Sequence, residues 1–370
     1  MRKAYISIAA LLLCGSMLMA QTPANRTAKT TAADVLAQMP AAKQAAYNKL
    51  IGDLSSTGEE GVLMLVNMIN APGKGSNANV DYALSGLTHY VMAKGEENAR
   101  LVTAKAYLKA LEMVNERETK AFIIRQLQML GKDECIDVLA SYLNDESLSG
   151  PAARALASNG SQKAGQALVA ALKSRTGSSK TQKDVIRAIA DARVDGAEPV
   201  LLVLQGASDP NMQKEVLYAL SCVGSSNSLP VLAKAAENAG YTMEVTGANE
   251  AYNALLKRLV QSDRDAVMKA AKKLQKAAAK AGQEQTREAA LQILLAAEEP
   301  AKVSKMVIAA MKDPSKNYRN AALSYASGFA DKELYIELMK MVPKAKPELK
   351  IDILNWIGRE AKKPVKHDII

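Results

Sequence analysis

Hydrophobic and polar residues alternate along this chain with the period of an α-helix, most clearly between residues 209 and 240. Apolar side chains recur at positions 212, 216, 219, 220 and 223, and again at 229, 232, 235, 236 and 239, which is the spacing of one helix face. Asp209 can cap a helix whose first residue is Pro210. We expect Gly224 to end this helix in the left-handed conformation and Gly240 to end the next. The stretch predicts two helices joined by a short turn.

Imperfect copies of this helix pair fill most of the chain. The similar segments RQLQMLG, RALASNG, RAIADAR, YALSCVG, QILLAAE, ALSYASG and ILNWIG place the ends of successive first helices at residues 131, 160, 193, 224, 298, 328 and 358. The steps between them are 29, 33, 31, 74, 30 and 30 residues. The long step contains one enlarged pair, at 249–259 and 265–281. A period near thirty predicts stacked two-helix repeats, because one pair alone cannot bury its apolar stripe.

One of these first helices carries a family resemblance. Asp313-Pro314, followed by Arg319, Ala321, Ala322 and Leu323, resembles the D-P-x(4)-R-x-A-A-L first helix of the HEAT-repeat proteins. Residues 43–370 fit this resemblance, although Glu215 stands near the arginine position of its own unit. The resemblance implies an all-α, armadillo-like helical fold: a right-handed α-solenoid of HEAT-like helix pairs. It is specific for this architecture and says almost nothing about a ligand.

The composition agrees with close-packed helices. The chain is 48% hydrophobic but only 4% aromatic, so small and aliphatic side chains must form the core. That core is unlike a β-sandwich, whose strands favour β-branched and aromatic residues. The formal net charge is +10, and it falls to +8 (10 − 2) without Arg2 and Lys3. A charge spread this evenly is typical of a solvated lysine-rich surface.

The first forty residues divide into two predicted segments. Residues 1–20 have a basic start, an apolar run and a small residue at Ala20, which is the pattern of a secretory signal peptide. Lipidation at Cys14 is disfavoured because Leu13 precedes it. Residues 21–40 are rich in Thr, Ala, Gln and Pro and predict a flexible tether. We therefore expect an exported protein, periplasmic or secreted, with its repeat array at 41–370.

The sequence pattern at the C-terminal end of the array predicts an incomplete repeat. Residues 348–358 predict a first helix, and residues 362–370 begin a second whose apolar stripe stops at Ile369 and Ile370. Solenoids normally close with a polar-faced unit. Exported bacterial arrays of this kind resemble those preceding a 3-keto-disaccharide hydrolase domain, and that resemblance implies a carbohydrate context. We expect a hydrolase domain, if there is one, beyond Ile370.

The sequence lacks the patterns that carry catalysis, metal or cofactor binding. His89 and His367 stand in distant units, and the zinc motif H-E-x-x-H is absent. The Gly73–Ser76 segment lacks the spacing of a phosphate-binding loop. Cys135 and Cys222 occupy separate units and predict two buried free thiols. We expect no enzyme activity and no cofactor.

The most distinctive local feature of the sequence is a predicted helix rich in lysine. Five lysines share one helix face, while Val267, Ala270, Ala271, Leu274, Ala277 and Ala278 supply the buried face; the lysines are Lys269, Lys272, Lys273, Lys276 and Lys280. A solvated face is the simplest interpretation. The alternative is a ridge that binds a polyanion, although nucleic acid is not expected because no aromatic residues are interleaved to stack bases.

The leading hypothesis is therefore an exported, non-catalytic scaffold. Its partner would be a protein or a glycan-associated molecule of the cell envelope, bound on a concave surface lined by second helices. Candidate contacts on second helices include Tyr142 and Tyr335, with Lys163, Gln166, Lys234 and Lys302. The alternatives are an accessory segment of a carbohydrate-active hydrolase and a polyanion-binding module using the lysine ridge.

Overall fold

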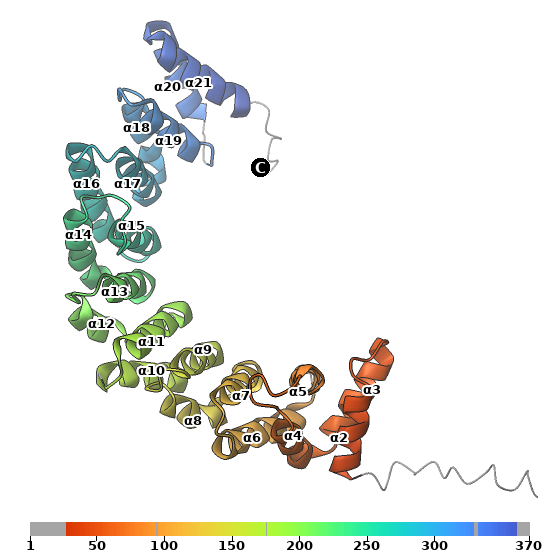
Figure 1. Cartoon of the computed structure of the whole chain (residues 1–370). Helices are drawn as coiled ribbons and strands as arrows, with labels where there is room; N and C mark the ends of the chain where they lie inside the picture. The colour runs from red at the N-terminus through yellow and green to blue at the C-terminus, as the bar shows by residue number, and fades with distance from the viewer. Residues whose placement is uncertain (1–26, 94, 175, 329–331, 361–370) are drawn as a thin grey trace, which may run out of the picture. The chain divides into compact units, whose positions relative to one another are not determined.

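The computed structural model describes residues 27–93, 95–174, 176–328 and 332–360, and within these ranges every regular element is helical. Two compact units divide the chain: Met1–Ala171 with Thr176–Thr181, and Leu172–Arg175 with Gln182–Ile370. Figure 1 labels the α-helices α2 to α21 in chain order. The predicted all-α fold of repeated helix pairs is confirmed.

The first unit is a two-layer stack. Its first layer contains α3 (Gln44–Ser55), α5 (Ala78–Val91), α7 (Arg117–Leu130) and α9 (Ser149–Asn159), each packed on the next. Its second layer contains α2 (Ala28–Ala37), α4 (Gly58–Asn67), α6 (Glu97–Met113) and α8 (Ile136–Ser141), which the 3-10 turn η2 (Asp133–Cys135) precedes. Helix α10 (Gln162–Ser174) follows α9.

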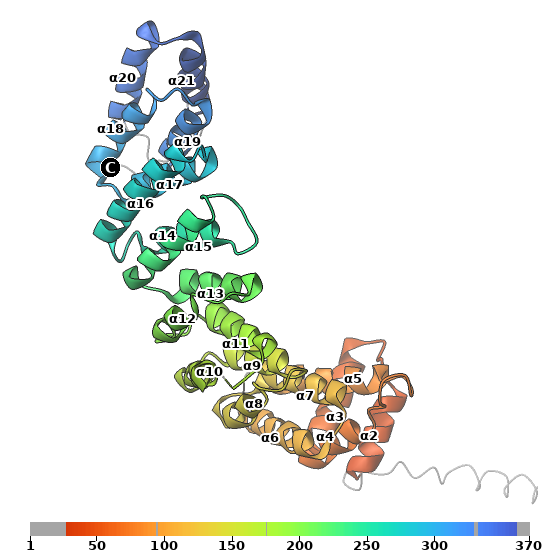
Figure 2. The ribbon, with the colours of Figure 1, turned by 60° about the vertical axis from the view of Figure 1, so that its left-hand side comes forward.

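The second unit repeats the same two-layer plan. After α11 (Ser179–Ala192), its first layer contains α13 (Pro210–Val223), α15 (Ala248–Leu259), α17 (Glu284–Ala297), α19 (Lys316–Ala326) and α21 (Pro347–Glu360). Its second helices are α12 (Glu198–Leu204), α14 (Leu229–Asn238), α16 (Arg264–Lys280), α18 (Pro300–Ala310) and α20 (Lys332–Met341), with the short turns η3 (Ser226–Ser228) and η4 (Val342–Lys344). Figure 2 shows these second helices beside their first-layer partners.

Side-chain hydrogen bonds join equivalent points of neighbouring repeats. The Gln128 amide donates to the Ser158 hydroxyl at 3.1 Å, 30 residues away. Glu198 accepts hydrogen bonds from the Ser225 backbone and from the Ser228 hydroxyl, 27 and 30 residues away. These separations match the period of about thirty residues in the sequence. The period therefore marks a physical contact between repeats as well as a recurring pattern.

Helix α2 corrects the prediction of a flexible tether at residues 21–40. The Thr27 side chain caps this helix, and Thr31, Ala32 and Val35 are buried where α2 packs on α3, α4 and α5. These few buried side chains were overlooked because the surrounding Thr, Ala and Gln gave a polar average.

Gly224 ends α13, but in a conformation different from the predicted one. Its φ is −67° and its ψ is 152°, which is extended backbone. A Cβ there would lie 2.5 Å from the Leu220 carbonyl oxygen and 2.6 Å from the Ser228 hydroxyl oxygen. The glycine is needed for this close approach to the next helix. Gly240, which was predicted to end the next helix, follows α14 closely and has a φ of +62°, in the left-handed region.

Several predictions concern positions outside the described residues. These are the signal peptide at 1–20, Cys14, His367 and the unfinished helix at 362–370. In the described part of the chain, no helix combines the length and apolarity that a bilayer crossing requires.

Candidate functional site

Four hollows on the described surface lie against first-layer helices. In the first unit, a hollow of about 190 Å³ lies at α5, α7 and the loop after α4. In the second unit, hollows of about 470, 440 and 750 Å³ lie at α13 with α15, at α15 with α17, and at α19 with α21. We had expected ligand-facing side chains on second helices. The largest of these four hollows, at α19 and α21, is the candidate site.

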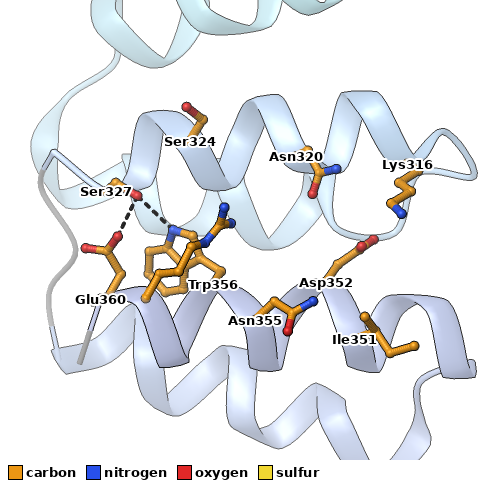
Figure 3. A pocket seen from close by; sticks show the side chains of 10 residues that line it. Lys316, Asn320, Ser324, Ser327, Ile351, Asp352, Asn355, Trp356 and Glu360 are labelled. Atoms are coloured by element: carbon orange, nitrogen blue, oxygen red, sulfur yellow. Dashed lines mark hydrogen bonds between the residues drawn. The ribbon is translucent and has the colours of Figure 1, made fainter. Parts of the chain in front are cut away.

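Two parallel rows of side chains form the walls of this α19–α21 groove (Figure 3). Helix α19 contributes Lys316, Asn320 and Ser324, and α21 contributes Ile351, Asn355 and Arg359. In each row the residues are four apart, so they line one face of their helix. Because α19 and α21 are both first helices of stacked repeats, the two rows face each other along the groove.

A buried ion pair forms part of the groove floor. Arg319 on α19 donates from Nε and Nη2 to Asp352 Oδ2 on α21, at 3.0 and 2.7 Å. Both side chains are 5% exposed. Arg319 Nη1 also donates to the carbonyl oxygens of Asp313 and Pro314, at 3.0 Å each. The arginine that carries the family resemblance therefore secures its own helix start and clamps α19 to α21.

Trp356 completes the floor. Its side chain is 1% exposed, and its ring centroid lies 5.3 Å from that of Tyr335 at an interplanar angle of 30°. The indole N–H donates to the Ser327 hydroxyl at 2.9 Å, and that hydroxyl donates to Glu360 Oε1 at 2.8 Å, as the dashed lines in Figure 3 show. This chain of hydrogen bonds fixes the deep end of the groove between the two helices.

The start of α19 is held from the other side by α16 and α17. The Ser315 side chain caps the helix by accepting from the Tyr318 N–H at 3.2 Å. The Tyr318 hydroxyl accepts from the Gln275 amide at 2.6 Å, and the Arg287 guanidinium lies 3.9 Å from the centroid of the Tyr318 ring. Burial raises the pKa of Tyr318 above its usual value. These contacts make the α19 wall rigid.

The polar groups on the walls differ from those on the floor. Five side chains in the groove make no hydrogen bond or ion pair with any described residue; they are Lys316, Asn320, Ser324, Asn355 and Arg359. All five can donate, and the two asparagines and the serine can also accept. The groove thus presents polar groups that bond no described residue, above a floor in which Arg319, Asp352, Trp356 and Ser327 bond one another or their helices.

The five predicted lysines lie together on α16. Lys269, Lys272, Lys273, Lys276 and Lys280 are all exposed, while Val267, Ala271, Leu274 and Ala278 are buried. Ala270 and Ala277 are half-buried. None of the five lysines forms an ion pair within the described chain. The residues form a continuous basic face, but they line none of the four hollows.

The other predicted contacts are dispersed. Tyr142 is half-buried at the end of α8, where the Lys120 ammonium lies 5.5 Å from its ring centroid. Tyr335 is half-buried on α20, where it packs on Trp356. Three of the lysines form ion pairs with neighbouring carboxylates: Lys163 with Asp137, Lys234 with Glu237 and Lys302 with Glu299. The structure does not bring these residues into one site.

Asn320 and Asn355 were missed by the sequence reasoning. They belong to different repeats, and only the stacking of α19 on α21 places them in one groove. A signal was present on α19, which carries a polar row at every fourth residue beside a buried stripe, whereas the α21 row begins with Ile351. A comparison of equivalent rows in neighbouring repeats would have found it.

The described residues contain no group of three or more His, Cys, Asp or Glu side chains arranged to hold a metal ion. His89 lies exposed on α5. Cys135 is a buried free thiol as predicted, and burial raises its pKa to about 12. Cys222 is also free, but it is only half-buried, because it lies at the edge of the buried stripe of α13.

Comparison with known proteins yields likenesses among solved structures alone. No family model matches the chain, and no curated protein matches it. One similar structure is described as "A conserved phosphorylation switch controls the interaction between cadherin and beta-catenin in vitro and in vivo", with 15% identity, a TM-score of 0.40, and coverage of 90% of this chain and 77% of that one. Another is described as "Crystal structure of Kap121p", with 12% identity, a TM-score of 0.41, and coverage of 96% of this chain and 47% of that one, so this chain spans about half its length. On its own helices, the present chain is an all-α protein of stacked helical repeats.

Proposed function

We propose that this protein is a non-catalytic helical-repeat scaffold that binds a polypeptide segment in the α19–α21 groove. The observation that carries the proposal is the set of five polar side chains around a hollow of about 750 Å³ that make no hydrogen bond or ion pair with any described residue. A ligand can bond these groups without first breaking hydrogen bonds to the described part of the chain. The clamped floor supplies the rigidity that lowers the entropic cost of binding.

The chemistry of the walls favours an extended polypeptide. The side-chain amides of Asn320 and Asn355 can each donate and accept, which matches the N–H and C=O groups of a peptide backbone. From Lys316 to Ser324 the α19 row rises roughly 12 Å, at about 1.5 Å per residue. An extended segment of about four residues covers that length. Lys316 and Arg359 lie at opposite ends of the groove and would attract carboxylates of the segment.

The groove is less suited to a glycan. Sugar rings commonly pack on exposed aromatic faces, and the aromatic residue in this groove, Trp356, is 1% exposed. Its ring serves the packing between α20 and α21. Of the two partner classes expected from the sequence, a protein is therefore better supported than a glycan-associated molecule.

The carboxylates in the groove support a binding role over acid–base chemistry. Asp352 is ion-paired with Arg319 at 5% exposure, and Glu360 accepts a hydrogen bond from Ser327. Neither carboxylate stands free in the hollow. Their contacts are those of groups that hold two helices together.

Peptide display offers a direct test. A random peptide library would be selected on the full chain, and the selected peptides measured against wild type and the Asn320→Ala, Asn355→Ala double variant. We expect at least a tenfold loss of affinity in the double variant and on N-methylation of the peptide backbone, with no loss in Lys272→Ala. Equal affinity of the selected peptides for wild type and the double variant would refute the proposal.

A second candidate function is polyanion binding by the basic face of α16. It is favoured by one observation, the exposure of five unpaired lysines on one helix face. Such a face would attract sulfated or phosphorylated polymers through long-range electrostatics, with strong dependence on salt.

We also propose that the protein is exported. This proposal is supported by the basic and apolar pattern of residues 1–20. Fusion of these residues to a reporter enzyme, followed by cell fractionation, tests it, and a reporter retained in the cytoplasm would overturn it. The hydrolase alternative is tested by the coding sequence downstream of Ile370, where a stop codon would exclude it.

A further inference from the structure

The loop between α14 and α15 projects from its helices (Figure 2), and several contacts specify its backbone conformation. Gly240, Tyr241 and Gly247 all have positive φ, at 62°, 60° and 62°. A non-glycine residue such as Tyr241 adopts this conformation at a cost, and it persists when surrounding contacts enforce it. The backbone conformation of the loop is therefore fixed by the contacts around it.

Side chains fix both ends of the loop. At its start, the Tyr241 carbonyl accepts from the Thr286 hydroxyl at 2.8 Å, and that hydroxyl accepts from the Asn249 amide at 2.8 Å. At its end, Glu244 accepts from the Thr246 N–H at 2.8 Å and from the Ala248 N–H at 3.2 Å. Burial opposes the charged form of Glu244, but these hydrogen bonds hold its pKa below the usual value.

The rigid loop carries two apolar side chains into solvent. Met243 is 80% exposed and Val245 is 60% exposed. An apolar group on a flexible loop can fold inward, whereas these two are held outward by the fixed backbone. Preorganised apolar side chains of this kind act as anchors in protein interfaces.

Two hollows flank α15 beside this loop. The hollow of about 470 Å³ has Tyr218, Ala251 and Ala254 in its walls, with the Arg187 guanidinium 4.5 Å from the centroid of the Tyr218 ring. The hollow of about 440 Å³ is lined by Met243, Ala254 and Ala289 among others. Both include Glu250 and Ala254, so they adjoin across α15. Each has room for one large apolar side chain.

Some of the charges around the hollows are paired and others are not. Arg187 forms an ion pair with Glu215 at 2.7 Å, and Glu244 caps the loop. Glu250 is exposed, belongs to both hollows and makes no ion pair with a described residue. Lys214 lies on α13, and Lys257 lies two turns beyond Glu250 on α15. Glu284 also lines the hollow of about 440 Å³, where it pairs with Arg287 at 3.2 Å, and several amide and hydroxyl side chains surround the apolar surface of that hollow. A partner must therefore complement a negative centre at Glu250, apolar surface on either side of it and positive charges farther out.

We propose that the loop and these two hollows form a second docking surface, for an extended polypeptide segment with large apolar side chains at positions i and i+4 and a lysine or arginine at i+2. In an extended chain these three side chains point to the same side. Positions i and i+4 lie roughly 13 Å apart at about 3.3 Å per residue, which is enough to cross one helix. The two apolar groups then enter the hollows on either side of α15, and the cation between them meets Glu250.

The test uses two defined peptides and the full chain. The first peptide is Asp-Phe-Ser-Lys-Ser-Phe-Asp, and the second has glutamate in place of its lysine. Fluorescence anisotropy with labelled peptides should show wild type preferring the lysine peptide by at least tenfold. Glu250→Lys should reverse this preference. Met243→Ser should weaken both peptides by about tenfold, which is near 1.4 kcal/mol, without changing the preference.

Lys272→Ala serves as the control, because Lys272 lines neither of the two hollows nor the α19–α21 groove and should leave both peptides unaffected. The titrations are repeated in the Asn320→Ala, Asn355→Ala background, which removes any binding in the α19–α21 groove and so separates the fate of the second surface from that of the first. Circular dichroism and thermal unfolding would confirm that each variant is folded. If Glu250→Lys is not folded, Glu250→Gln replaces it and should abolish the preference for the lysine peptide. The proposal is overturned if wild type binds neither peptide at about 1 mM, or if the preference is unchanged in folded Glu250 variants.

Discussion

The α19–α21 groove and the lysine face of α16 each present five polar side chains, but they differ in what lies beneath them. The groove is made by two helices, and its floor is tied by the Arg319–Asp352 ion pair and the Trp356–Ser327 hydrogen bond. The α16 face belongs to one helix, whose underside is packed by Val267 and other aliphatic residues. Polar residues on one helix make a charged surface, whereas polar residues on two clamped helices make a site with shape.

The two regions also differ in the entropy that binding would cost. Asn320, Ser324 and Asn355 have short side chains, which lose little rotamer freedom when they bond a ligand. A lysine side chain loses up to about 2 kcal/mol of that freedom. The groove therefore suits a specific partner, and the α16 face suits a partner that needs only charge.

The largest expected effect comes from removing one member of the buried pair. Asp352→Ala leaves the Arg319 guanidinium buried without its counter-ion, and such changes cost about 3–5 kcal/mol. Urea denaturation monitored by tryptophan fluorescence measures this loss of stability close to the pair, because Trp356 is the chain's single tryptophan and lies beside the pair. No comparable loss is expected from any single lysine of α16.

A paired substitution is the control for this prediction. Arg319→Met with Asp352→Leu replaces both charges by apolar groups and should recover most of the lost stability. A loss below about 1 kcal/mol in Asp352→Ala would contradict the clamp, because a truly buried unpaired charge costs more.

The sequence singled out Arg319 as a motif residue, but it predicted neither the ion pair with Asp352 nor the groove above it. Arg319 stood out because its spacing from Asp313-Pro314 is a local pattern, and the structure gives that spacing a cause in the hydrogen bonds from Arg319 to the Asp313 and Pro314 carbonyls. Asp352 and Asn355 lie more than thirty residues away. Their role depends on the register between stacked repeats, which helical periodicity within one segment does not specify.

The same limit explains two smaller errors. Gly224 was assigned the left-handed conformation typical of a helix end, but its actual constraint is the close approach of Ser228 at the start of the next helix. Residues 28–37 were assigned to a tether because their composition is polar on average. Local signals predicted the elements well, and contacts between elements decided the rest.

The second prediction concerns polyanion binding by α16. Replacing Lys269, Lys272 and Lys276 with Glu reverses three charges on the exposed face, and each basic side chain near an anionic surface contributes about 1 kcal/mol. Any affinity for heparin should fall by at least a hundredfold at low salt, measured by isothermal titration. Unchanged affinity, or loss of affinity in the Asn320→Ala, Asn355→Ala variant instead, would remove α16 as the polyanion site.

The third prediction concerns the deep end of the groove. Trp356→Phe keeps an aromatic ring but removes the N–H that donates to Ser327. The loss of this bond and of some packing should cost about 1–2 kcal/mol, measured by circular dichroism during urea denaturation because the fluorescent probe is gone. Ser327→Ala should cost a similar amount, and a near-zero cost for both would show that the Trp356–Ser327–Glu360 chain does not secure α21.

The smallest expected effects distinguish the walls of the groove from its floor. Asn320→Ala removes a side chain that bonds nothing in the described chain, and Ala has a higher helix propensity than Asn by roughly 0.6 kcal/mol. The free energy of unfolding should therefore be unchanged or rise slightly, as it should for Lys272→Ala on α16, within about 0.5 kcal/mol. The two substitutions should differ in their effect on binding. The selected peptides should bind Asn320→Ala more weakly than wild type, and they should bind Lys272→Ala as tightly as wild type. A destabilisation above about 1 kcal/mol in Asn320→Ala would mean that Asn320 holds α19 in place, and the groove would then be part of the packing between repeats.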